Sequence, residues 1–313
     1  MNIIKYRKVF FLISLIVLVP GIIALSLWGL KLGIDFRGGT LWEVKFVDKK
    51  DLPSDLSAKE GTLNRELFQN YLNENGFEVS STSQTSQESI LVRSKVTSEE
   101  KINEVRAKVS EKYGEIEDVR LETVGPTIST ELTKKAFLAV GISILAILTY
   151  ITWAFRKIPK PTSSLAFGIA TIIALIHDVI VVVGIFAILG HFLNIEIDSL
   201  FITALLTVIG FSVHDTIVVF DRIRENLIKH AGSSFENVVN DSLLQTIGRS
   251  LNTSLTAIFV LIALFLFGGE SIKTFVLALL IGIISGTYSS IFNAAPLLVV
   301  WHNIQINYKK EKK

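Results

Sequence analysis

The chain has 313 residues, of which half are apolar and 19% are charged, and its formal net charge is only +2. This balance excludes the strongly basic surface typical of nucleic-acid-binding proteins. The absence of cysteine excludes disulfides, thiolate metal sites and cysteine nucleophiles, and it leaves the redox compartment open. The charges gather in short clusters between long uncharged stretches, which is typical of a protein that crosses a membrane several times.

Six nearly uncharged segments are each long enough to cross a bilayer as a helix. A hydrocarbon core of about 30 Å requires roughly 20 helical residues. The first segment resembles a cleaved signal peptide in position, but its 22 residues exceed the apolar run of such peptides, which favours a retained anchor. The predicted spans are Val9–Leu30, Ala136–Phe155, Ser164–Gly190, Ser199–Phe220, Ser250–Gly269 and Thr274–Trp301.

Basic residues predict the orientation, because Lys and Arg are enriched near the cytoplasmic ends of membrane spans. They precede the first span, join the second to the third, follow the fourth and close the chain, whereas the loop 191–197 has none. We therefore expect both termini in the cytoplasm and residues 31–135 outside it. The expected plan is a first span within 1–30, an exported domain at 31–135, five spans within 136–301 with a cytoplasmic loop at 221–249, and a basic tail at 302–313.

The exported segment has the periodicities of a water-soluble domain. Its elements occur in the order β-α-β-β-α-β, which predicts a ferredoxin-like α+β sandwich with both helices on one face of an antiparallel sheet. In the first of these helices, Leu63, Leu67 and Leu72 are expected to face the sheet. The predicted elements are Leu41–Asp48, helix Leu63–Asn75, Phe77–Ser83, Ser89–Lys95, a helix opened by the capping box Thr97–Glu100, and Glu115–Val124.

Ionisable side chains inside the spans indicate function, because a charge at membrane depth is costly and usually faces a protein or water-filled interior. Asp215 lies six residues before Asp221, the expected end of its span, and so about 9 Å deep. Ser212, one turn earlier, is expected to hydrogen-bond it. Arg249 opens the fifth span, and a polar stripe follows it on one face. The stripe consists of Asn252, Thr253 and Thr256, and Asn293 of the sixth span falls at a similar depth.

The expected convergence of Asp215 and Arg249 has two interpretations. Desolvation favours the protonated form of a carboxyl group, whereas a nearby guanidinium favours the ionised form. Movement of the arginine would then switch the carboxyl group between holding and releasing a proton, as in a proton relay. Alternatively, the two groups form a static buried ion pair that only fixes helix packing. The residues alone leave both interpretations open.

A second His-Asp dipeptide, His177-Asp178, lies in the third span and repeats the pattern of His214-Asp215. Counting helical rises places it about 12 Å further out than Asp215. It is either a second station on a proton path or a packing pair. No further ligands with a recognisable spacing accompany the two dipeptides, which argues against a metal or hydrolase site.

Two further segments are expected to serve packing. Gly282 and Gly286, with Ala278 one turn earlier, give the sixth span a small-residue face for close helix contact. Ser233–Ile247 begins with a capping-box pattern and has the periodicity of an amphipathic helix. Its apolar residues either face the membrane surface or, in the interpretation that we favour, belong to a simple linker helix.

Four separated motifs resemble the SecD/SecF family of bacterial protein-export membrane proteins, and within it the SecF-type subunits. The likeness extends from about Val9 to Trp301. The first motif is no phosphate loop, because its glycines follow a membrane helix and not a strand. In an extended segment the side chains of Asp35 and Arg37 would point the same way. They would then either clamp the domain to the membrane surface or form an ion pair with each other. The motifs are Gly33–Thr40, with Gly33, Asp35, Arg37, Gly38 and Gly39, then Val124–Ser129, Gly210–Asn226 and Arg249–Thr256.

The resemblance implies a partner, a location and a role. Members of this type pair with SecD in the bacterial inner membrane, forming a twelve-helix unit akin to resistance-nodulation-division transporters. The pair associates with the SecYEG channel and uses the proton gradient to draw out preproteins that the SecA ATPase has pushed in. The resemblance assigns proton coupling to Asp215 and Arg249, with Ser212 and His214 beside them. It implies contact with lipid, no nucleic acid, no cofactor and no catalysed reaction.

Two other functions compete with this expectation. A small-molecule or lipid exporter of the resistance-nodulation-division type usually carries two large exported domains in twelve helices, whereas this chain is expected to have one in six. A purely structural translocon subunit would not need Asp215 to titrate.

Overall fold

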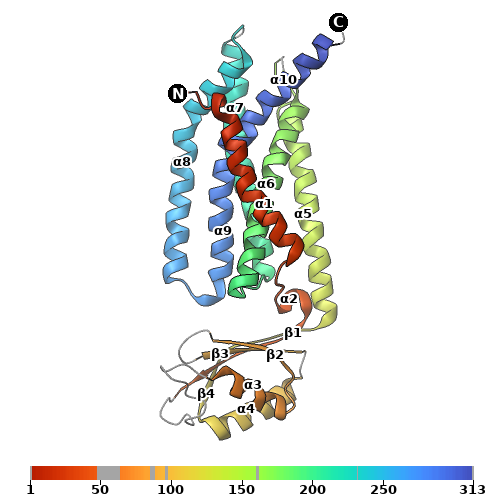
Figure 1. Ribbon diagram of the computed structural model, residues 1–313, viewed down its shortest axis with the longest axis vertical. Helices are drawn as coiled ribbons and strands as arrows, with labels where there is room; N and C mark the ends of the chain where they lie inside the picture. The colour runs from red at the N-terminus through yellow and green to blue at the C-terminus, as the bar shows by residue number, and fades with distance from the viewer. Residues whose placement is uncertain are drawn as a thin grey trace. The chain divides into compact units, whose positions relative to one another are not determined.

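The computed structural model describes residues 2–47, 64–84, 89–95, 98–159, 162–230 and 232–311. They form two compact units, one made of Met1–Lys31 with Ala136–Lys313 and the other of Leu32–Lys135. The first unit is a bundle of long helices, and the second contains a four-stranded sheet (Figure 1).

Six helical segments of the described chain are long and apolar enough to cross a membrane, which confirms the predicted number of spans. The sixth is interrupted by one turn of π-helix, η2, which holds Asn293. The spans are α1 (Arg7–Leu27) after the short η1 (Ile4–Tyr6), α5 (Pro126–Ala154), α6 (Ser164–Leu193), α7 (Ser199–Lys229), α8 (Phe235–Phe267), and α9 (Glu270–Ser289) with η2 (Ser290–Ala294) and α10 (Ala295–Glu311).

Several helices extend beyond the predicted spans, because hydropathy marks only the part of a helix that lies in hydrocarbon. Most of the segment 221–249, expected as a cytoplasmic loop, belongs to the end of α7 and the beginning of α8. The side chain of Ser234, not Ser233, caps α8 by accepting from the Asn237 amide. The segment expected as a linker helix is the first part of α8, and its alternative as a surface helix is wrong, since Phe235 and Val239 belong to the bundle core.

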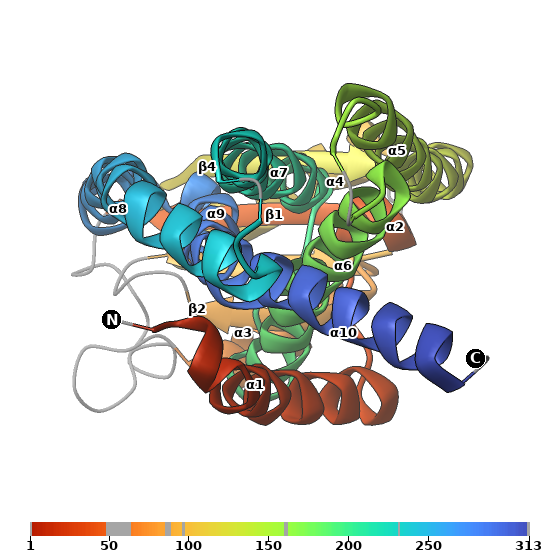
Figure 2. The ribbon, with the colours of Figure 1, turned by 90° about the horizontal axis from the view of Figure 1, so that it is seen from above.

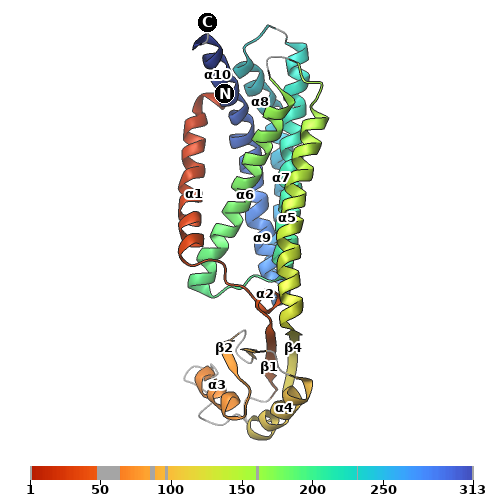
Figure 3. The same ribbon diagram turned by 90° about the vertical axis from the view of Figure 1, so that its right-hand side faces the viewer.

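The bundle has an inner and an outer set of helices. At least half of the apolar window is buried in α6, in α7 and in the sixth span, but less than a fifth is buried in α1, α5 and α8. Figures 2 and 3 show α1 and α5 on opposite sides of α6. The N-terminus, the C-terminus, the end of α7 and the start of α8 lie at the same end of the bundle (Figure 1). We call this the basic end, after Arg7, Arg156, Arg222 and Arg224.

Small residues let the inner helices approach closely, as predicted for the sixth span. A Cβ atom at Gly282 would lie 2.1 Å from Cγ2 of Val208, and one at Gly286 would lie 3.0 Å from Cβ of Ser212. Glycine at both positions therefore sets the distance between α9 and α7.

The second unit confirms the predicted ferredoxin-like domain. Its sheet has the order β2-β3-β1-β4 with antiparallel pairing throughout. Alternate residues of β1, including Trp42, Val44 and Phe46, are fully buried on the face that the helices cover. The elements are α2 (Ile34–Arg37), β1 (Gly39–Phe46), α3 (Arg65–Glu74), β2 (Val79–Gln84), β3 (Ser89–Ser94), α4 (Glu99–Tyr113) and β4 (Ile116–Val124).

Two local predictions in this unit are wrong. The face of α3 that packs on the sheet carries Phe68 and Leu72, whereas Leu67 is 40% exposed; Leu63 lies outside the described residues. The residue that caps α4 is Ser98, whose hydroxyl accepts from the Lys101 amide, and Thr97 also lies outside the described residues. Both helices begin later than predicted, and helix ends are the least certain part of an assignment.

Candidate functional site

Asp215 is a buried carboxyl group inside the helical bundle. It lies on α7, 14 residues before the end of the helix at Lys229, and only 2% of its surface is exposed. Among the described residues its side chain has a single hydrogen bond, from Oγ of Ser254 on α8 at 3.3 Å. Thr287 of α9 in turn donates to Ser254 Oγ at 2.6 Å. A buried carboxyl group with one long hydrogen bond is poorly compensated in its ionised form.

Arg249 does not pair with Asp215, contrary to the predicted convergence. Its side chain is exposed, and the structure records no ion pair between the two described residues. The reason is rotational: neighbouring helix positions differ by about 100°, and Ser250 and Ser254 occupy the inner face of α8. The static buried pair of the second interpretation is therefore missing from the described chain.

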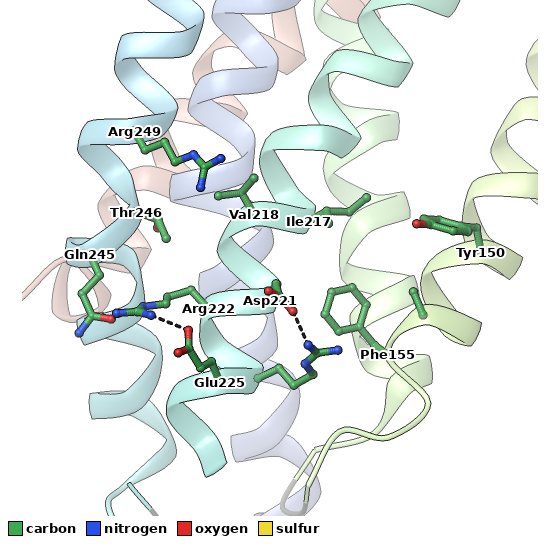
Figure 4. Close-up of a pocket in the computed structure, with 12 residues that line it drawn as sticks. Tyr150, Phe155, Ile217, Val218, Asp221, Arg222, Glu225, Gln245, Thr246 and Arg249 are labelled. Atoms are coloured by element: carbon green, nitrogen blue, oxygen red, sulfur yellow. Dashed lines mark hydrogen bonds and ion pairs between the residues drawn. The ribbon is translucent and has the colours of Figure 1, made fainter. Parts of the chain in front are cut away.

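Arg249 instead lines a pocket of about 500 Å³ between α5, α7 and α8 (Figure 4). Two ion pairs lie in the same pocket, between Arg224 and Asp221 at 2.8 Å and between Arg222 and Glu225 at 2.5 Å. Arg249 makes no ion pair with any described residue, so its charge remains available to a partner.

The predicted polar stripe faces away from the bundle. Asn252, Thr253 and Thr256 are exposed, and the two threonine hydroxyls donate to carbonyl groups one turn earlier on α8. Asn293 is buried elsewhere, where its Oδ1 accepts from Ser14 of α1 at 3.0 Å. The stripe and Asn293 therefore do not converge on Asp215. The spacing of polar residues shows that a membrane helix has a polar face, but it does not show what that face contacts.

Ser212 binds Asp178 and not Asp215. Its Oγ lies 2.6 Å from Asp178 Oδ2, which also accepts from Ser289 at 2.6 Å. Asp178 Oδ1 accepts from Ser285 at 2.7 Å and lies 3.0 Å from Nδ1 of His177. Asp178 is 1% exposed and joins α6, α7 and α9. A carboxylate with this many donors is well compensated, which favours the packing interpretation of this dipeptide.

The two aspartates lie closer in depth than predicted. Because Asp178 contacts Ser212, which is one turn from Asp215, their levels differ by about 4.5 Å, not 12 Å. The earlier count placed the end of the fourth span at Phe220, whereas α7 continues to Lys229. Nε2 of His177 is buried and has no hydrogen-bond partner among the described residues. His214, by contrast, is exposed.

The Gly-rich signature shapes the backbone where β1 begins. Gly38 and Gly39 have φ values of 75° and 134°, and a Cβ atom at Gly39 would lie 2.7 Å from the Ser94 carbonyl oxygen. Both positions therefore require glycine. Residues 34–37 form the helical turn α2, so Asp35 and Arg37 do not point the same way. Gly33 is the residue before this turn.

Sequence reasoning missed the hydroxyl groups that contact the two aspartates. They lie at Ser254, which contacts Asp215, and at Ser285 and Ser289, which contact Asp178. Sequence reasoning also missed Thr287, which contacts Ser254, and all four side chains are buried. A signal was present, because Ser285–Ser290 contains four hydroxyl residues besides a tyrosine in an otherwise apolar span. No group of three His, Asp or Glu side chains in the described chain is arranged to hold a metal ion.

Comparisons with known proteins place these features in a family. The model of the C-terminal region of the protein export membrane proteins SecD/SecF matches residues 104–304, and that of the SecD/SecF GG motif matches residues 29–49. The chain is 49% identical to a protein translocase subunit SecF of Thermobaculum terrenum, over 96% of this chain and 94% of that one. It is 42% identical to the corresponding subunit of Anaerolinea thermophila, over 97% and 94% of the two chains.

Solved structures agree with this likeness. A Thermus SecDF, described as a translocon-associated membrane protein, matches with a TM-score of 0.80 at 33% identity. The match covers 97% of this chain and 39% of that chain. SecDF in a super-membrane-facing form matches with a TM-score of 0.69 at 30% identity, over 100% of this chain and 40% of the other. The chain therefore belongs to the SecD/SecF family of protein-export membrane proteins.

Proposed function

We propose that this chain is the SecF-type accessory subunit of the Sec translocase and that it couples proton movement to preprotein export together with SecD. The names of its relatives support protein export over small-molecule export. The observation that carries the coupling is Asp215, a buried carboxyl group with one long hydrogen bond and no ion pair among the described residues. Such a group is well placed to take up and release a proton.

An uncovered polar face supports a membrane partner. His214 of α7 and Arg249 and Asn252 of α8 are exposed on the bundle, and in lipid such side chains are costly. The solved SecDF chains are about two and a half times as long as the part that this chain matches. SecD is the natural cover for this face, and its helices would exclude lipid from Arg249.

Coupling follows from the change in charge at Asp215. When protonated, the carboxyl group is neutral and suits its apolar surroundings. When ionised, it needs a cation or further donors, and Arg249 is the nearest candidate on α8, five residues before Ser254. Each cycle would therefore change the contacts between α7 and α8. The basic end faces the cytoplasm in this proposal, SecYEG and SecA act on the same preprotein, and the subunit catalyses no covalent reaction.

The test uses inverted membrane vesicles that lack SecD and its partner, restored with this chain, with SecD, or with both. Preprotein translocation is measured with ATP, in the presence and absence of a proton gradient. We expect stimulation by the gradient only when both chains are present, and we expect them to purify together in mild detergent. Equal translocation in all three vesicle preparations would reject the proposal.

A further inference from the structure

Four hydroxyl side chains follow one another along the buried face of α8, four residues apart. They are Ser242, Thr246, Ser250 and Ser254, with exposures of 0%, 6%, 2% and 1%. Helix positions four residues apart lie on the same side, separated by about 6 Å along the axis. The row therefore runs from the basic end of the bundle to the level of Asp215.

The two ends of this row have defined contacts. At one end, Ser254 donates to Asp215. Toward the other end, Thr246 lines the pocket shared with Arg249 (Figure 4). Asp221 and Glu225 also line this pocket, and their side chains are 56% and 42% exposed, so solvent reaches it. Ser242 is closed off, because it donates to the Val238 carbonyl and accepts from Asn226.

Ser250, between these ends, has a buried Oγ with no hydrogen-bond partner among the described residues. A serine in a helix can donate to the carbonyl four residues earlier, as Thr246 does to Ser242 at 2.9 Å. Leaving a buried hydroxyl unpaired costs about 1–3 kcal/mol. One water molecule bridges two oxygens that are about 5.5 Å apart, which matches the ~6 Å rise between successive hydroxyls. The unpaired hydroxyl of Ser250 therefore lacks the partners that bridging water molecules would supply.

We propose that water molecules bridge Thr246, Ser250 and Ser254 and form a proton path between Asp215 and the pocket at the basic end. This path rests on the proposed proton coupling at Asp215. On release, the O–H bond of the Asp215 carboxyl group breaks and a new O–H bond forms on Ser254 Oγ. Ser254 passes its own proton to the bridging water, and each following oxygen along the row does the same. One proton enters the pocket, the carboxylate remains, and no electron moves.

Thr287 acts as a positioning residue for this path. Its Oγ1 lies 2.6 Å from Ser254 Oγ and 2.8 Å from the Ile283 carbonyl oxygen. Because a hydroxyl has one proton, Thr287 donates to only one of these at a time. When it turns to its own helix, Ser254 gains a free lone pair toward Ser250 and the row becomes continuous.

The test measures proton flux into liposomes that contain the complex with SecD, reported by a pH-sensitive dye and normalised to folded complex. Ser250→Ala and Thr246→Val remove path hydroxyls, and we expect each to slow the flux at least about tenfold. Ser250→Thr keeps a hydroxyl at this position, so its flux should stay close to that of the unaltered complex, unlike that of Ser250→Ala. Thr171→Val is the matched control, because Thr171 of α6 is buried and donates only to the Phe167 carbonyl. It should leave the flux unchanged.

A spectroscopic readout separates the path from simple packing. Ser254→Ala removes the donor to Asp215, so the infrared C=O band of the protonated carboxyl group should move to higher frequency. The band is identified by its loss in Asp215→Asn.

Asp215→Asn also separates this proposal from the function on which it rests. If this variant abolishes the flux while Ser250→Ala and Thr246→Val keep it within twofold, the path is wrong and the coupling stands. Equal losses in Ser250→Ala and Ser250→Thr would likewise overturn the path, because packing would then explain both. If Asp215→Asn leaves the flux unchanged, the proposed function itself fails.

Discussion

Substitution of Gly282 by alanine tests the packing that sets the distance between α7 and α9. The added Cβ would lie 2.1 Å from Cγ2 and 2.7 Å from Cγ1 of Val208, whereas carbon atoms normally stay at least about 3.5 Å apart. Val208 is 1% exposed and β-branched, so it cannot turn away within its helix. Either the helices separate or Val208 leaves its rotamer, which costs about 1–3 kcal/mol.

The better helix propensity of alanine offsets about 1 kcal/mol of that cost. We therefore expect Gly282→Ala to lower the free energy of unfolding by up to about 2 kcal/mol. Gly141→Ala on α5 is the control, because a Cβ there meets nothing within 4 Å. Thermal unfolding of the purified complex in mild detergent compares the two.

A second substitution checks the contact itself. Val208→Ala removes both close Cγ atoms, which leaves only the Val208 Cβ at 2.9 Å from the new methyl group. The double variant should therefore be more stable than the sum of the two single effects. If Gly282→Ala melts no lower than Gly141→Ala, or if the two effects simply add, the described packing of α7 on α9 is refuted.

Two further predictions concern the aspartate junction and the topology. Asp178→Ala removes the acceptor for the hydroxyls of Ser212, Ser285 and Ser289, which should cost at least about 3 kcal/mol and reduce the amount of protein in the membrane; unchanged amounts on quantitative immunoblots would contradict the junction. A reporter that is active only outside the cytoplasm should work when fused within residues 49–61 and fail at His230. Activity at His230 would contradict the proposed orientation.

The fold could be predicted from sequence because its signals are local. The uncharged length of a span such as Ser164–Gly190 is a property of consecutive residues, and hydrocarbon imposes it directly. The alternation around Trp42 likewise acts within a few residues. The helix ends outside the hydrocarbon gave no such signal, so α7 and α8 are longer than predicted.

The contacts of the site could be predicted only in part, because they depend on how helices face one another. That Asp215 and Asp178 are buried follows from the cost of a charge in lipid. Which serine reaches which aspartate depends on the rotation of α7, α8 and α9, and periodicity in one helix does not fix it. Ser212 was assigned to Asp215 because it is one turn away, yet its rotamer points to α6.

The wrong prediction that Arg249 contacts Asp215 has a similar explanation. Periodicity placed Arg249 on the polar face of α8 with Asn252 and Thr253, and that face is uncovered in a single chain. The polar face of a membrane helix contacts either the interior of its own bundle or a neighbouring subunit, and one sequence does not distinguish these. We therefore propose that the second chain completes the site.

Export by vesicles that carry Asp215→Asn tests the proposed coupling most directly. Asparagine keeps the size of the side chain and can still accept from Ser254, and no described cation loses an ion pair. We therefore expect a normal amount of protein, normal association with SecD and normal ATP-driven translocation, with loss of the stimulation by a proton gradient. Full stimulation with asparagine at position 215 would contradict the account.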